Sequence, residues 1–197
     1  MPPISTNMHF GKLFIENSNK EINIPSFIIG IVAPDTINED DFEDLHTLDE
    51  DGNIDVREFY EQFNFNDLDI FQKSFILGYY CHLWFDEYYK FNASKLTLHN
   101  NVDLTDEELG KAVKTILKHY DNKAINNFFE KYNKDINEFN IKINLKEING
   151  ISINKSKEKI QEFLKDTIPD VVYPHLIEEQ EYMSFIKNGC SKIMRSL

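Results

Sequence analysis

Hydrophobic and polar residues follow helical spacing along most of the chain. In residues 56–63, for example, Phe59 and Phe63 are four positions apart, which places both side chains on one face of a helix. Thr105 is followed three positions later by Glu108, a pattern typical of a capped helix start. Together the patterns predict helices over residues 8–16, 56–63, 67–91, 104–120, 122–132, 155–164 and 175–194. We therefore expect one all-α, multi-helix domain that spans residues 1–197.

The segment 67–91 is the most informative of the predicted helices. Its middle, residues 75–89, is apolar almost all round, so this helix is expected at the centre of the bundle. Asn66 or Asp67 is the predicted cap. Cys81 lies inside the apolar run and is expected to be a small buried core residue.

Three other segments differ from these helices in their patterns. Residues 24–33 form a compact apolar stretch that Pro34 ends, because proline disfavours helical geometry in the residue before it. Residues 37–55 are acidic and loop-like. Residues 141–153 alternate apolar and polar positions around Asn149-Gly150, a dipeptide that suits a tight turn, and they predict a small β-hairpin.

Composition and charge narrow the function classes. Apolar residues make up 41% of the chain, enough for one core, and the formal net charge is −13. A surface this acidic repels phosphate backbones and argues against a nucleic-acid scaffold role, although a bound cation can reverse the local field. Cys81 and Cys190 make neither a disulfide framework nor a CxxC metal site. No segment reads as a signal peptide or a membrane span, so we expect a cytoplasmic protein without a transmembrane segment.

The candidate chemistry centres on His82 and Asp86, which share one face of the apolar helix. A carboxylate in such surroundings is costly unless it is paired or binds a metal. From these two residues alone, a bound divalent cation and a His–Asp pair without metal both stay open. Asp35 just past a helix end, His46 in a polar loop and His9 on the first helix complete a set of imidazole and carboxylate groups. Zinc prefers this set of ligands at hydrolytic sites.

The order and spacing of these residues resemble the zinc-dependent phospholipase C family. The resemblance rests on His9, on residues 25–35 (PSFIIGIVAPD), on His46 and on residues 75–86 (FILGYYCHLWFD). It covers the first half of the chain in detail and the helical remainder in outline. It implies the multi-helix fold that this family shares with the fungal single-strand nucleases.

The resemblance also implies an activity and a set of site residues. Carried over motif by motif, it implies that Asp35, His46, His82 and Asp86 hold one zinc ion, and that Asp86 bridges to another zinc ion that also takes His9. A full family site holds three zinc ions, and we expect two here within a range of one to three. The implied function is a zinc-dependent phosphoester hydrolase, in which metal-bound hydroxide attacks the phosphorus of a small phosphoester or phospholipid. Asp35 is then the candidate catalytic base.

Two features depart from the family pattern. Secreted members bind zinc through a processed N-terminal tryptophan, whereas eight residues precede His9 in this chain. A further family zinc uses an HxxxE pair, and the matching spacing occurs only far downstream, at His175 and Glu179. His119 and Asp121 are an equally loose candidate pair for metal binding.

A rival motif lies in residues 47–58, which are similar to the calcium loop of an EF-hand. Asp49, Asp51 and Glu58 stand at ligand positions and Gly52 at the turn, but Thr47 stands where the first aspartate is expected. The alternatives are therefore a non-catalytic calcium- or partner-binding helical protein, and a family member with altered chemistry in a biosynthetic pathway.

Overall fold

Seven α-helices account for most of the chain in the computed structural model, which describes residues 2–36, 46, 48–99, 103–140, 151–166, 170, 173 and 175–197. They are α1 (Ile4–Asn17), α2 (Ile24–Val32), α4 (Val56–Glu61), α5 (Ile70–Asn92), α6 (Asp106–Glu138), α7 (Ile153–Lys165) and α8 (Glu179–Ser196). Short 3₁₀ turns follow or precede some of them: η1 (Ala33–Thr36), η3 (Phe65–Asp67) and η4 (Ala93–Lys95). Within the described residues, extended pairing is limited to an isolated bridge between Leu48 and Ile54. The all-α prediction is confirmed.

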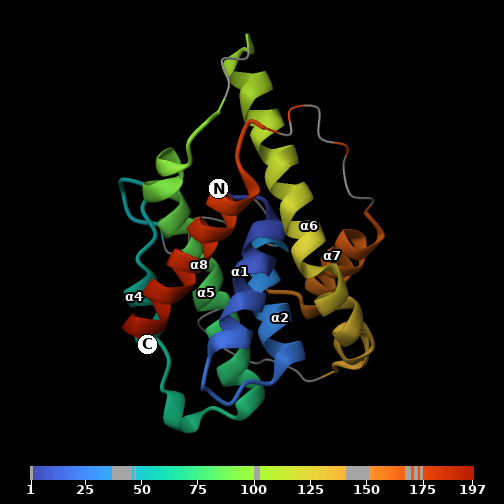
Figure 1. The fold of residues 1–197 in the computed structure, drawn as a ribbon. Coiled ribbons are helices and arrows are strands. Elements are labelled where there is room, and N and C mark those ends of the chain that lie inside the picture. Colours follow the sequence, from blue (N-terminus) through green and yellow to red (C-terminus); the bar gives the residue numbers. More distant parts are fainter. Residues whose placement is uncertain are drawn as a thin grey trace.

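Helix α1 lies in the middle of the bundle, where it contacts α2, α5, α6 and α8 (Figure 1). Its first half is buried without interruption from Ser5 to Gly11, although several of these side chains are polar. Helix α5 is buried from Ser74 to Leu83, as its all-round apolar pattern predicts. Cys81 is fully buried, which confirms its expected place in the core.

Helices α2 and α5 cross with their backbones in close contact. A Cβ atom built on Gly30 would lie 2.2 Å from the carbonyl oxygen of Phe75, and one built on Gly78 would lie 2.2 Å from the carbonyl oxygen of Phe27. Only glycine permits this approach, because any side chain would drive the two helices apart. The crossing therefore brings the end of α2 against the middle of α5.

The helix starts follow local capping chemistry. Asn23 caps α2 by accepting a hydrogen bond from the Ser26 amide. Thr105 and Glu108 form the capping box predicted for α6. The cap predicted for α5 is wrong by two to three residues, because residues 65–67 form the η3 turn and Asp69 makes the capping box instead.

Other predicted boundaries also need correction. The helices predicted over 104–120 and 122–132 are one continuous helix, α6, with Asp121 buried at the junction. The helix predicted to begin at His175 begins at Glu179, after a turn. The predicted hairpin lies mostly outside the described residues, and its last residues lead into α7, which Ser152 caps. Across the described ranges, every helix is too short or too polar to cross a membrane.

Candidate metal centre

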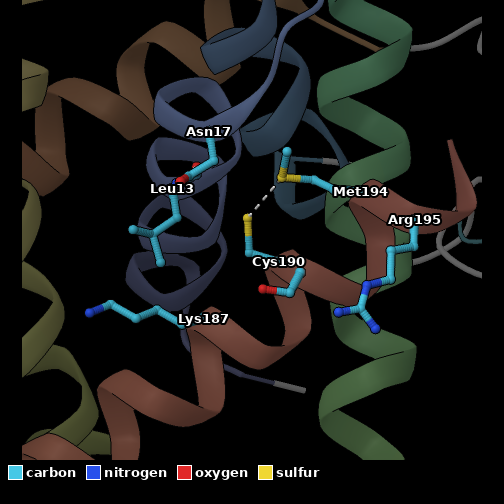
Figure 2. Close-up of a pocket in the computed structure, with 7 residues that line it drawn as sticks. Leu13, Asn17, Lys187, Cys190, Met194 and Arg195 are labelled. Carbon is cyan, nitrogen blue, oxygen red and sulfur yellow. Dashed lines mark hydrogen bonds between the residues drawn. The ribbon is translucent and has the colours of Figure 1, made fainter.

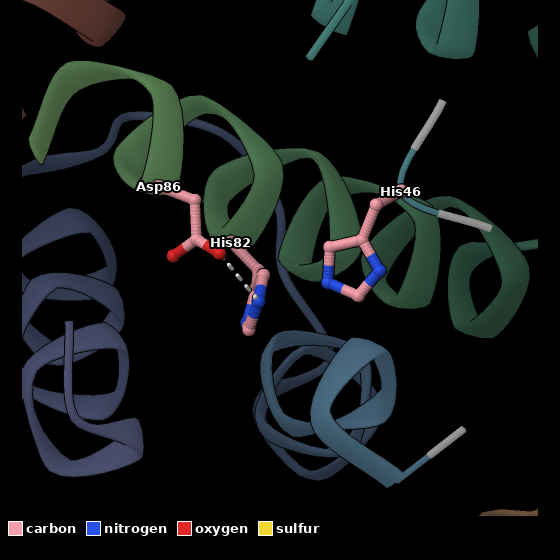
Figure 3. Close-up of side chains that lie close together, drawn as sticks. All are labelled: His46, His82 and Asp86. Atoms are coloured by element: carbon pink, nitrogen blue, oxygen red, sulfur yellow. Dashed lines mark ion pairs between the residues drawn. The ribbon is translucent and has the colours of Figure 1, made fainter. Parts of the chain in front are cut away.

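Two histidines and an aspartate meet inside the bundle. His46, His82 and Asp86 each offer a donor atom, and these atoms all lie within 4.8 Å of one another (Figure 3). His46 and His82 are fully buried, and Asp86 is 4% exposed. Asp35 is the fourth group, with its Oδ1 atom 3.9 Å from His82 Nε2. The four residues expected to bind a single zinc ion are thus neighbours around His82, and their role as ligands stays a prediction.

The local structure explains how these groups converge. His82 and Asp86 are one helical turn apart on α5 and project from the same face (Figure 3). Asp35 lies in η1, directly after α2, so the close crossing of α2 and α5 carries its carboxylate to His82. His46 comes from a separate segment, and its ring lies edge-on to that of His82 with the centroids 5.8 Å apart.

One backbone hydrogen bond orients the His82 ring. The Nδ1 atom lies 2.9 Å from the carbonyl oxygen of Ile31, so the Nδ1–H group donates to it. The other ring nitrogen, Nε2, then faces Asp86 Oδ2 at 3.4 Å and Asp35 Oδ1 at 3.9 Å. Histidines that bind metals commonly donate their second ring N–H to a carbonyl or carboxylate in this way.

The electrostatics of the centre favour a cation. Burial opposes the charged form of His82, but Asp86 and Asp35 outweigh it and raise its pKa to about 9. Burial works to raise the pKa of Asp86, but His82 and Asn7 outweigh it, and the pKa is lowered. Burial raises the pKa of Asp35 despite the attraction of His82. Without metal, a protonated His82 therefore supplies the positive charge between two carboxylates.

Asn7 is a part of this centre that the sequence motifs did not reveal. Its Nδ2 atom donates to Asp86 Oδ1 at 3.0 Å and lies 3.2 Å from His82 Nδ1. The only local signal is the polar run from Ser5 to Asn7, and its burial becomes visible only once the neighbouring helices are in place.

His9 lies on the other side of α1 and contacts Asp121 rather than the metal centre. It was expected to share a zinc ion with Asp86, but its Nδ1 atom is 2.9 Å from Asp121 Oδ1. Asn7 and His9 are two positions apart, which separates their side chains by about 160° around the helix axis. Because Asn7 points at Asp86, His9 points away from it. The expectation that His9 and Asp86 share a zinc ion is therefore corrected: His9 contacts Asp121 instead.

Asp121 is the acceptor at the centre of a buried hydrogen-bond network that joins α1, α6 and α8. Its Oδ2 atom accepts from Thr6 at 2.7 Å and from Ser5 at 3.1 Å, and its Oδ1 atom accepts from Tyr182 at 2.8 Å as well as contacting His9. We call these five residues the Asp121 network. Both carboxylate oxygens have two partners each, so the network satisfies Asp121 without a metal ion.

The remaining downstream candidates do not converge. His119 and Asp121 are two positions apart on α6, with Asp121 fully buried and His119 only half-buried, so they do not share a face. His175 lies in a turn before α8 and is exposed. Glu179 is the first residue of α8 and forms an ion pair with Lys123 at 3.0 Å. The helical HxxxE pair expected from the spacing is therefore wrong.

The EF-hand-like segment forms a turn that its own hydrogen bonds hold. The Asp49 side chain accepts from the amides of Asp51 and Asn53, and Gly52 has a φ of 72°. These backbone contacts lower the pKa of Asp49, with the Asn53 bond the largest cause. Glu58 is exposed on α4, and Thr47 lies outside the described residues. Calcium binding stays an alternative prediction, and the turn explains the acidic pattern without it.

A pocket of about 390 Å³ adjoins the centre, and His46 and Asp86 form part of its wall. Leu48 and Ile54 contribute apolar lining, and Lys90 contributes a cation. Lys90 Nζ is held by the Gly52 carbonyl oxygen at 2.8 Å and joins the turn to α5. A ligand in this pocket would touch the candidate metal ligands directly.

A larger pocket, of about 480 Å³, lies between α1 and α8 (Figure 2). Leu13 and Asn17 line it from α1, and Lys187, Cys190 and Arg195 line it from α8. It contains none of the candidate metal ligands. The smaller pocket is therefore the better candidate for a substrate site, because position beside reactive groups matters more than size.

Comparisons with known proteins found no family model, no curated protein and no solved structure that matches the chain. The resemblance to the zinc-dependent phospholipase C family stays a prediction that rests on the residues and their spacing.

Proposed function

We propose that this protein is a zinc-dependent phosphoester hydrolase. The observation that carries the proposal is the buried cluster of His46, His82 and Asp86, with donor atoms within 4.8 Å of one another and Asp35 beside them. Imidazole nitrogens and carboxylate oxygens are the donor set that zinc takes at catalytic sites.

Two atoms in the centre fit a cation better than they fit a purely structural role. Asp86 Oδ2 is buried, lacks a hydrogen bond of standard geometry within the residues that the structure describes, and is held by the longer ion pair with His82 Nε2 at 3.4 Å. His82 Nε2 faces this oxygen while Nδ1 is committed to the Ile31 carbonyl. A buried carboxylate oxygen with so long a contact is costly to keep charged, and a divalent cation at this point would lower that cost.

In the proposed reaction, the residues of the cluster have two roles: three would bind the metal ion and one would act as the base. His46, His82 and Asp86 would hold the ion, which when bound supplies an acidified water and balances negative charge on phosphorus. Asp35 is 23% exposed and lies at the edge of the cluster, where its carboxylate can take a proton from water. Burial raises the pKa of Asp35, which brings it closer to the range of a useful base.

The pocket beside the centre indicates the kind of substrate. Its lining is mainly apolar, with Lys90, Glu87 and Asp86 as charged groups. The net charge of −13 disfavours polyanions such as nucleic acids. We therefore propose a phosphoester that carries an apolar group, such as a phospholipid or a small aryl or alkyl phosphodiester.

Metal analysis combined with activity assays tests the proposal. After dialysis, purified protein should retain zinc and hydrolyse members of a phosphodiester panel. His82→Ala and Asp86→Ala should lose both zinc and turnover. His99→Ala is the control, because His99 is exposed and contacts Glu181 at 3.1 Å, outside the cluster. An Asp86→Ala protein that keeps its zinc and its activity would refute the assignment.

A further inference from the structure

We propose that Asn7 is a positioning residue for the metal centre, which fixes the orientation of the Asp86 carboxylate from the neighbouring helix. The inference rests on the proposed function, because it concerns the same cluster. Asn7 is 1% exposed and lies in the first half of α1, where that helix packs against α5. None of the sequence motifs includes it.

The first step of the argument is the hydrogen bond to Asp86. Asn7 Nδ2 donates to Oδ1 at 3.0 Å, and the opposite oxygen, Oδ2, faces His82 Nε2 at 3.4 Å. A carboxylate that is held at one oxygen loses its freedom to rotate. Asn7 thereby keeps Oδ2 directed toward the other candidate ligands.

The second step concerns the contact between Asn7 and His82. Nδ2 lies 3.2 Å from His82 Nδ1, but that ring nitrogen already donates its proton to the Ile31 carbonyl at 2.9 Å. Two donors cannot bond to each other, so this contact is packing alone. Nδ2 also lies 3.5 Å from His82 Nε2, but its bond to Asp86 Oδ1, at 3.0 Å, is the shorter one and directs the amide mainly at Asp86.

The third step is how Asn7 is itself held in place. On the other side of α1, Ser5, Thr6 and His9 bond to Asp121 and fix the rotation of the helix about its axis. The Asn7 Oδ1 atom is buried and accepts no hydrogen bond from any part of the chain that the structure describes. A buried amide with an unsatisfied oxygen weakens the fold. This local cost is typical of residues placed for a site.

The test compares Asn7→Leu with Asn17→Leu, both on α1. Leucine matches the size of asparagine and removes the donor, and Asn17 is exposed at the far end of the helix. Zinc affinity is measured by competition with a chelator, and the centre is also followed by the visible spectrum of the cobalt-loaded protein. Asn7→Leu should weaken zinc binding by about 10- to 100-fold and change the cobalt spectrum. Thermal unfolding of the metal-free protein measures separately the cost of losing the hydrogen bond to Asp86, and Asn17→Leu should leave affinity and spectrum unchanged.

The outcomes separate this inference from the proposed function. If wild-type protein binds zinc and Asn7→Leu binds it equally tightly with the same cobalt spectrum, the positioning role is refuted and the hydrolase proposal stands. If wild-type protein binds no zinc, the proposed function fails and the inference fails with it. Should Asn7→Leu not fold, Asn7→Ala provides the same comparison with a smaller side chain and the same expected loss of affinity.

Discussion

Replacing Gly78 by alanine changes the helix contact on which the candidate metal centre is built. In a free helix, alanine is favoured over glycine by about 1 kcal/mol. At Gly78 the new Cβ would lie 2.2 Å from the Phe27 carbonyl oxygen and 2.9 Å from the Ile31 amide nitrogen. To reach an ordinary contact of 3.4 Å or more, the two helices must separate by about 1 Å.

The expected magnitude follows from the balance of these two effects. Forcing extra atoms into a packed contact costs about 1–3 kcal/mol and sometimes more, and here the obstacle is backbone, which cannot rotate away. We take the upper end of this range, about 3 kcal/mol, and subtract the helical gain of about 1 kcal/mol, so the free energy of unfolding should fall by about 2 kcal/mol. For a chain of this length, the Tm should fall by roughly 4–8 °C. The separation would also stretch the 2.9 Å bond from His82 Nδ1 to the Ile31 carbonyl, so zinc affinity should fall as well.

Gly110→Ala supplies the matched control. Gly110 also lies in a helix, but a Cβ atom there meets nothing within 4 Å. Its replacement should raise the Tm by roughly 2–4 °C and leave zinc affinity unchanged. Thermal unfolding by circular dichroism measures both variants. A Gly78→Ala protein that unfolds at or above the wild-type temperature would show that α2 and α5 do not cross with their backbones in contact.

Three further predictions concern buried polar side chains, those of Asn122, Asp121 and His82. The side-chain nitrogen and oxygen of Asn122 are both buried without a hydrogen bond inside the described ranges. Asn122→Leu should therefore raise the free energy of unfolding, measured by denaturant titration, by about 1–3 kcal/mol. A decrease would mean that the amide has a partner. Asp121→Ala leaves several buried donors unpaired and should lower the Tm by roughly 10 °C. Asp166→Ala, which breaks an exposed ion pair with Lys118, should change the Tm little, and equal effects of the two substitutions would contradict the Asp121 network. In the metal-free folded protein, the neighbouring carboxylates raise the pKa of His82 from 6.5 to about 9. Protonated His82 therefore contributes fully to the free energy of unfolding below pH 6.5, and this contribution is lost as the pH rises through 9. The free energy of unfolding with chelator present should therefore fall by about 3 kcal/mol over that range, and a His82→Gln protein that shows the same fall would refute this cause.

Local patterns predicted much of the fold because its longest buried helix carries its own signal. The apolar run in α5 and the four-residue spacing of His82 and Asp86 are properties of one segment, and the structure follows both. The α6 capping box is also local, since Thr105 and Glu108 satisfy each other's backbone contacts. Signals of this kind need no knowledge of neighbouring helices.

The predictions that failed depend on contacts between distant segments. A break was expected in α6 near Asp121, but partners more than sixty residues away satisfy its carboxylate, so the helix continues. Asn7 is another case, because its place beside Asp86 follows from the rotation of α1 and not from the residues around it. His9 stands two positions away and was predicted to bind metal, yet the same rotation directs it to Asp121.

These placements bear on how many metal ions the proposed enzyme would hold. The sequence led us to expect two zinc ions, with Asp86 bridging to the second, which would also take His9. In the part of the chain that the structure describes, the groups that could hold a metal form one cluster, around His46, His82 and Asp86, while His9 is engaged by Asp121. We therefore propose one ion per chain, with Asp35 as a further carboxylate beside it. Activation of the attacking water needs a base for its proton, and we propose Asp35 for this role because it is 23% exposed and lies at the edge of the cluster, 3.9 Å from His82.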